Sequence, residues 1–171
     1  MLKLLGLFTL VTACGMVGIM KAQELKSRIC LLIEMQNLIS EMKGKMNYFH
    51  EPLFQIFQRS AQKSNLRAFQ LPADTLVEFR EKGGEISQIW AEKTNEIYKG
   101  TSLMEDDLEI IRHIGTYIGQ SSFENQQMQF KYTEERLATQ LDTARAEYQQ
   151  KGPMYQKTGF FLGMISALVL I

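Results

Sequence analysis

The sequence contains little of several residue types that would define a specialised class of protein. Its 171 residues include two cysteines, three prolines, one tryptophan and 12 glycines. Two cysteines cannot form a disulfide scaffold, and so few prolines and glycines exclude a collagen-like or Pro/Gly-rich disordered chain. The 19 basic residues only balance the 19 acidic ones. This leaves no basic excess to hold a phosphate backbone, so no nucleic-acid partner is expected.

Charge is also missing from both ends of the chain. All 19 acidic residues lie between Glu24 and Glu147, and no charged residue lies between Leu4 and Met20 or after Lys157. The neutral average therefore conceals two apolar ends around a charged middle segment. The ends and the middle have to be interpreted separately.

The N-terminal apolar run, Leu4–Met20, has three interpretations. As a helix it spans about 25 Å, close to the lower limit for crossing a hydrocarbon core about 30 Å thick. Lys3 and Lys21 flank it, and we expect a transmembrane anchor over residues 1–21. The alternatives are a cleaved secretory signal, which the length of the apolar run disfavours, and a lipoprotein signal with lipidation at Cys14.

The C-terminal apolar run, residues 158–171, reaches about 21 Å as a helix. It is apolar on every side, and Lys157 and Tyr155 precede it at positions typical of interface anchors. We expect a short transmembrane segment over residues 154–171, with a buried core helix or an interfacial helix as the alternative. Because the flanking basic residues lie mostly on the side of the middle segment, the positive-inside rule places residues 22–153 in the cytoplasm.

The middle segment shows the apolar spacing of helices throughout. Over residues 25–49 the predicted buried stripe recurs at intervals of three and four, and over residues 123–148 apolar side chains recur at intervals of seven, four and three. Both spacings place these side chains on one face of a helix. Gly83-Gly84 and Gly152-Pro153 predict helix ends, and Pro72 predicts that the chain restarts there. No alternating strand pattern competes. The sequence therefore predicts an all-α fold, an antiparallel bundle of about six helices flanked by the two transmembrane helices.

Residue types that could carry chemistry do not form a catalytic or metal-binding pattern. His50 and His113 are 63 positions apart, and neither has a histidine or cysteine at ligand spacing. Glu105, Asp106 and Asp107 suit the first turn of a helix, where acidic side chains interact favourably with the helix dipole. We therefore expect no enzymatic activity, no cofactor and no metal site.

Two local clusters of charge remain in the middle segment. Residues 55–73 contain Arg59, Lys63 and Arg67 and no acid, whereas residues 85–109 contain seven acids and two lysines. Solvated helix faces are one interpretation. The other is a pair of complementary docking surfaces for a large partner, or for a second copy in a homo-oligomer.

Several segments together resemble a known family. The segments are Lys3–Gly6, the turn Glu51–Leu53, the run Ile114–Gln126, and the tail glycines Gly159 and Gly163. The most specific part has Gly115 and Gly119 four positions apart, followed by Gln126. The pattern resembles the stage III sporulation protein AB family of endospore-forming bacteria over nearly the whole chain. It departs from that pattern at Ser121-Ser122, where the family usually has Ser-Asp, so an acidic cap is missing.

The resemblance implies a role in a membrane assembly. The family is similar to the cytoplasmic helical domain of inner-membrane platform proteins of type II secretion and type IV pilus systems. It implies a non-enzymatic platform component of the channel between mother cell and forespore, in the mother-cell membrane. The implied partners are the bilayer, other sporulation channel subunits and a secretion-type ATPase. Gly115, Gly119 and Gln126 become packing or interface candidates. The alternative is a membrane-anchored lipoprotein or sensor whose helical domain lies outside the cytoplasm.

Overall fold

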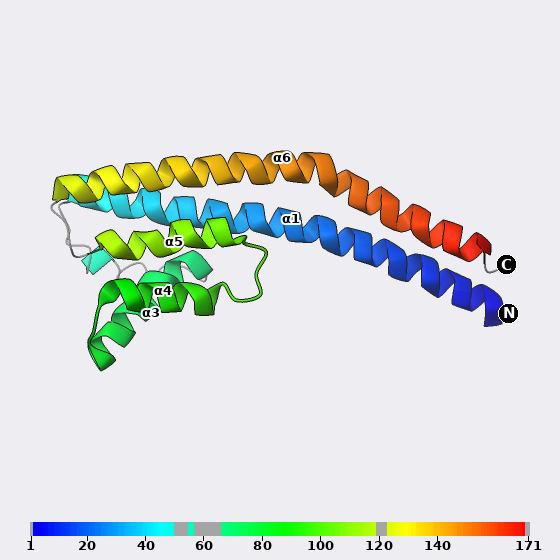
Figure 1. Ribbon diagram of the computed structural model, residues 1–171, viewed down its shortest axis with the longest axis horizontal. Helices are drawn as coiled ribbons and strands as arrows, with labels where there is room; N and C mark the ends of the chain where they lie inside the picture. Colours follow the sequence, from blue (N-terminus) through cyan, green and yellow to red (C-terminus); the bar gives the residue numbers. More distant parts are fainter. Residues whose placement is uncertain (1, 50–54, 57–65, 119–122, 170–171) are drawn as a thin grey trace. The chain divides into compact units, whose positions relative to one another are not determined.

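The computed structural model describes residues 2–49, 55–56, 66–118 and 123–169, and every regular element in these residues is a helix. Apart from the helical pair 55–56, the described part forms five helices (Figure 1), which are α1 (Leu2–Phe49), α3 (Arg67–Lys82), α4 (Ile86–Ile97), α5 (Glu105–Tyr117) and α6 (Phe123–Val169). The predicted all-α fold is confirmed for this part of the chain.

Within the described residues the number of helices differs from the expected number, because two predicted breaks do not occur. Pro72 lies buried inside α3, where packing holds the helix together despite the lost backbone bond. Pro153 lies inside α6, a helix of 47 residues, which tolerates one missing hydrogen bond. The predicted restart at Pro72 and the predicted helix end at Gly152-Pro153 are therefore wrong. The N-terminal apolar run likewise continues without interruption into the rest of α1.

Glycines end helices where the backbone turns into the left-handed region. α3 ends at Lys82, and Gly83 has a φ of 65° and donates its N–H to the Phe79 carbonyl at 3.0 Å. Gly84 follows with a φ of 107°. Because side chains with a Cβ disfavour such φ values, the predicted helix end at this glycine pair is confirmed.

The chain divides into two units that are described separately. The arm unit comprises Met1–Ile29 and Asp142–Ile171, and the central unit comprises Cys30–Leu141. Each unit therefore takes one part of α1 and one part of α6. The boundaries of the expected membrane segments, after residue 21 and before residue 154, are a different division of the chain and stay predictions.

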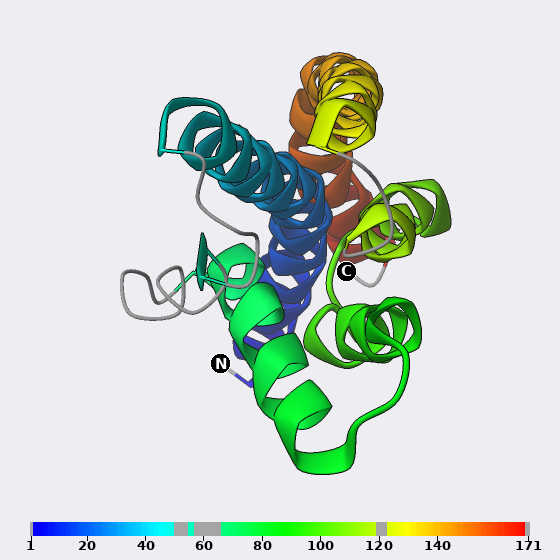
Figure 2. The same cartoon turned by 90° about the vertical axis from the view of Figure 1, so that its left-hand side faces the viewer.

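The core of the central unit forms along the predicted apolar stripes. The fully buried side chains from these stripes include Leu32, Ile39, Met42, Phe130 and Leu137. α3 packs on α4 and α4 packs on α5, and Figure 2 shows these three helices gathered together. Removing this apolar surface from water is the main force that holds the short helices in place.

Specific hydrogen bonds connect neighbouring helices in the central unit. Trp90 of α4 is completely buried, and its Nε1 donates to the Ile111 carbonyl of α5 at 2.7 Å. The hydroxyls of Tyr117 on α5 and Thr133 on α6 lie 3.0 Å apart. Satisfying polar atoms inside an apolar core favours one helix arrangement over its alternatives.

In the arm unit, the N-terminal part of α1 and the C-terminal part of α6 run antiparallel, side by side, and both chain ends lie at the same end of the pair (Figure 1). Among the residues that the structure describes, no helix is both long enough and apolar enough to cross a membrane.

Candidate functional site

Glycines bring the two arms into close contact. A Cβ on Gly159 would lie 2.8 Å from the carbonyl oxygen of Cys14, and a Cβ on Gly163 would lie 3.0 Å from an α1 backbone atom. Gly18 packs in the same way against the carbonyl oxygen of Tyr155, with no room for a Cβ. Larger side chains at these positions would push the helices apart, so the glycines determine how closely the arms approach.

This contact was not predicted from the sequence, although the sequence carries a signal for it. Gly159 and Gly163 are four residues apart in an apolar segment, and Cys14, Gly18 and Ala22 repeat the same spacing in α1. Small residues four apart lie on one face of a helix and are typical of close helix pairs in lipid. The structure shows that these two faces meet.

The outer surface of the arms is apolar. Most of the exposed large apolar side chains in the described part lie there, namely Met16, Val17, Ile19, Met20, Met154, Phe160, Phe161, Leu162, Met164, Ile165 and Leu168. The inner face of the pair is filled by small residues, so these larger side chains point outward. Soluble proteins rarely expose a continuous apolar surface of this kind, which marks a site of interaction.

Charged contacts begin where the apolar surface ends. Arg28 is buried, and its guanidinium lies 3.2 Å from Oε2 of Glu147, whereas Lys151 Nζ lies 2.6 Å from Oε1 of the same carboxylate. Lys21 pairs with Glu24 at 2.8 Å. The Arg28–Glu147 pair joins α1 to α6 and favours one register of the two arms, because a buried charge without its partner is costly.

Two of the three packing candidates make contacts inside the central unit. A Cβ on Gly115 would lie 2.9 Å from three side-chain atoms of Trp90. Gln126 donates to the Tyr117 carbonyl at 3.5 Å. Gly119 lies outside the described residues. A glycine at position 115 thus leaves space for the indole of α4, whereas the role of these residues at a partner interface stays a prediction.

Of the three docking candidates, the described residues include only Arg67. Arg67 is exposed in the first turn of α3, and Arg59 and Lys63 lie outside the described residues. Docking through these three basic side chains stays a prediction.

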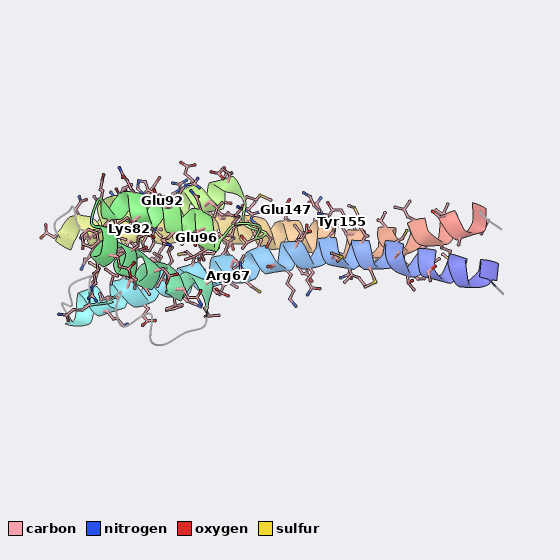
Figure 3. The ribbon with its side chains drawn as sticks, turned by 90° about the horizontal axis from the view of Figure 1, so that it is seen from below. Arg67, Lys82, Glu92, Glu96, Glu147 and Tyr155 are labelled. Carbon is pink, nitrogen blue, oxygen red and sulfur yellow. The ribbon has the colours of Figure 1, made fainter. Side chains whose placement is uncertain are left out.

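Ion pairs connect the acid-rich segment, residues 85–109, to α3. Lys93 of α4 lies 2.7 Å from Glu96 and 2.9 Å from Glu78 of α3, and Lys82 lies 2.6 Å from Glu78. The hydrogen bond with Glu96, and to a lesser extent that with Glu78, raises the pKa of Lys93. The hydrogen bonds that Lys82 and Lys93 donate lower the pKa of Glu78. Figure 3 labels Lys82, Glu92 and Glu96 on this part of the central unit.

Other charged residues have structural roles that the geometry explains. Asp107 is completely buried in the first turn of α5 and accepts a hydrogen bond from the Met104 backbone N–H at 2.9 Å. The acidic run therefore lies in the first turn of a helix, as the sequence predicted. His113 is exposed, with its ring 6.0 Å from that of Tyr117. Within the described residues, no three histidine, cysteine, aspartate or glutamate side chains gather in a way that could hold a metal ion.

A surface cleft of about 520 Å³ lies between α1 and α6 in the central unit. Its lining includes Ser40, Lys43 and Glu134, and both Ser40 and Lys43 donate hydrogen bonds to the Glu134 carboxylate. The main polar groups of the cleft therefore contact one another across the helix pair.

Comparisons with known proteins establish the family. The sequence profile of the family described as stage III sporulation protein AB matches residues 3–171, and the chain belongs to this family. A solved structure described as stage III sporulation protein AB is similar with a TM-score of 0.61 and 15% identity, covering 71% of this chain and 96% of that chain. At this identity the likeness shows the fold. No curated protein matches. The family inferred from sequence motifs is confirmed.

Proposed function

We propose that the chain is a membrane-bound, non-enzymatic platform subunit of the channel between mother cell and forespore. In this proposal the paired arms insert into the mother-cell membrane that faces the forespore. The central unit lies in the cytoplasm and docks a secretion-type ATPase together with other channel subunits. Membership of the stage III sporulation protein AB family supports a role in sporulation.

The observation that carries the membrane part of the proposal is the apolar outer surface of the arms. Phe161, Ile165 and Leu168 are among the large side chains exposed there, and no charged residue follows Lys157. In lipid, glycine contacts between helices and apolar outer faces are both favourable. In water, the same surface would have to be covered by another protein.

Membrane insertion is tested by placing charge on the outer surface of the full chain. The variant F161E/I165E should be lost from cell membranes washed at alkaline pH, because a carboxylate in the hydrocarbon core is unfavourable by about 2.5–3.5 kcal/mol on insertion scales. The matched control is Val77→Glu, which introduces the same charge at an exposed apolar side chain of α3 and should leave the chain in the membrane fraction.

The role in sporulation is tested with the same variants in cells that lack the native chain. F161E/I165E should fail to restore the formation of heat-resistant spores, whereas Val77→Glu should restore it. Retention of F161E/I165E in washed membranes, together with normal spore formation, would refute the insertion of the arms.

ATPase docking is tested by crosslinking and pull-down of the full chain during sporulation. We expect a secretion-type ATPase and channel subunits among the captured proteins. We also expect weaker capture after charge reversal at Arg59, Lys63 and Arg67, since charged surface residues guide association. If charge reversal leaves the amount of captured ATPase unchanged, Arg59, Lys63 and Arg67 do not form the docking surface.

A cytoplasmic central unit requires that the N-terminal segment is not processed at Cys14. The intact mass of the purified chain should therefore correspond to the uncleaved polypeptide. A mass showing cleavage before Cys14 with an attached lipid would favour the lipoprotein alternative. Such cleavage would also remove the part of the α1 arm before Cys14, including the Val11 backbone that Gly163 contacts.

A further inference from the structure

Two lysines from different helices lie at the same level of the arm pair. Gly18 packs against the carbonyl oxygen of Tyr155. Lys21 is almost one helical turn beyond Gly18, and Lys151 is about one turn before Tyr155, so in an antiparallel pair they come to one level. Figure 3 labels Tyr155 and Glu147 on α6.

This level coincides with the edge of the apolar surface. Met20 and Met154 are exposed on its apolar side, whereas Glu24 and Glu147 follow on the charged side. Lysine and tyrosine side chains at such a boundary can reach the headgroup layer of a bilayer while their apolar parts stay on the hydrocarbon. The two lysine side chains are accessible, with 57% and 41% of their surfaces exposed.

The ion pairs at this level leave part of each lysine available to a ligand. Lys21 pairs with Glu24, and Lys151 pairs with Glu147, which Arg28 also contacts. Because an ammonium group has three N–H donors, each lysine can donate to a phosphate oxygen while it keeps its glutamate partner, and the Tyr155 hydroxyl can donate a further hydrogen bond.

We propose that Lys21, Lys151 and Tyr155 form a binding site for the headgroup of an anionic phospholipid at the edge of the membrane. The site rests on the proposed insertion of the arms, and it adds a lipid class to that function. The apolar surface on one side would hold the acyl chains, and the lysines would select a headgroup with net negative charge over a zwitterionic one.

The test measures which lipid the full chain retains. The chain is purified in a neutral detergent containing equal parts of phosphatidylglycerol and phosphatidylcholine, and the co-purified lipids are quantified by mass spectrometry. We expect enrichment of phosphatidylglycerol in the native chain. In the variant K21Q/K151Q the enrichment should fall by about fivefold for each lysine removed. Excess inorganic phosphate should not displace the lipid, because it lacks the acyl chains.

The control is Lys82→Gln on α3. Like Lys151, Lys82 forms an ion pair of 2.6 Å with a glutamate four positions earlier in its helix. Lys82 lies in the central unit, away from the proposed site. This variant should keep the native enrichment.

The possible results separate this site from the proposed function. Equal retention of both lipids would overturn the headgroup site and leave membrane insertion intact. Unchanged enrichment in K21Q/K151Q, an equal loss in Lys82→Gln, or displacement by inorganic phosphate would also overturn the site. A chain that retains neither lipid would contradict membrane insertion itself.

Discussion

The guanidinium of Arg28 lies 3.2 Å from the Glu147 carboxylate, and only 3% of the arginine side chain is exposed. This pair links positions 119 residues apart in the sequence and lies where the apolar surface of the arms gives way to charge. Its energetic role differs from that of surface ion pairs, because neither group is fully solvated when the pair is broken.

We predict that Arg28→Ala lowers the stability of the arm unit by about 1.5–3 kcal/mol, because it removes one of the two cations that contact the partly buried Glu147 carboxylate. Hydrogen exchange of the arm amides, in the full chain in neutral detergent, measures this change. The control Arg145→Ala removes an arginine of the same unit whose pair with Asp142 is exposed and 3.6 Å long. It should change stability by less than about 0.5 kcal/mol. Equal effects would show that the buried pair has no special role.

We predict that Gly159→Leu separates the arms. Its Cβ alone would lie 2.8 Å from the Cys14 carbonyl oxygen, and overpacking of this kind costs about 1–3 kcal/mol. The control is Gly15→Leu, because nothing lies within 4 Å of a Cβ at that position of α1. Faster hydrogen exchange in both arms is expected for Gly159→Leu only. If both variants exchange alike, the glycine contact does not hold the arms together.

We predict that Gly115→Ala destabilises the central unit by about 1–3 kcal/mol, since the new methyl group would lie 2.9 Å from the Trp90 side chain. Gly44→Ala is the matched control, a helical glycine with open space around its Cβ. This change should be neutral or stabilising by up to about 1 kcal/mol through helix propensity. Urea unfolding followed by circular dichroism compares the two. A Gly115→Ala variant as stable as the Gly44→Ala variant would contradict the packing role.

We predict opposite effects for two tyrosine-to-phenylalanine changes. Tyr117→Phe removes the hydrogen bond to Thr133 and should cost about 1 kcal/mol. The Tyr98 hydroxyl is buried without a hydrogen-bond partner among the described residues. Tyr98→Phe should therefore be neutral or stabilising, because it removes a desolvated polar group. Urea unfolding near neutral pH measures both changes. A similar loss of stability in the two variants would contradict the different hydrogen bonding of the two hydroxyls.

The same tyrosines predict a loss of stability at alkaline pH. Burial raises the pKa of Tyr98 and of Tyr117 above the ordinary tyrosine value, so the folded state keeps protons that the unfolded state releases. Stability should be unaffected below the ordinary tyrosine pKa and should fall as the pH rises from there towards the folded-state pKa. Urea midpoints measured across this range should decline less steeply in the phenylalanine variants.

The periodicity of apolar residues predicted which side of each helix faces the core. This prediction needs only the sequence of the helix itself, because residues three and four apart lie on the same face. Ile39, Met42 and Leu137 are buried as their stripes require. The prediction of helix breaks at Pro72 and Pro153 was wrong, because local helix propensity takes no account of tertiary packing or of the length of the helix. Tertiary burial holds α3 together at Pro72, and the length of α6 absorbs the loss at Pro153.

The contacts between helices could be predicted only in part. The sequence indicated that Gly115 leaves room for a neighbour, but Trp90 as that neighbour depends on how α4 and α5 pair. The glycines of the two arms carried a recognisable spacing in each segment. Their mutual contact becomes apparent only when residues from opposite ends of the chain are placed side by side.

The packing of Trp90 against α5 has a practical consequence for spectroscopy. Trp90 is the only tryptophan of the chain, and its indole is enclosed by Gly115 and the Ile111 carbonyl. Indole fluorescence therefore reports the packing of the central unit, and the arms contribute no tryptophan signal. A shift in emission on adding a partner would come from α4 and its surroundings. Events in the arms would need a label at Cys14, in a variant in which Cys30 of the central unit, which is also free and is exposed, is replaced.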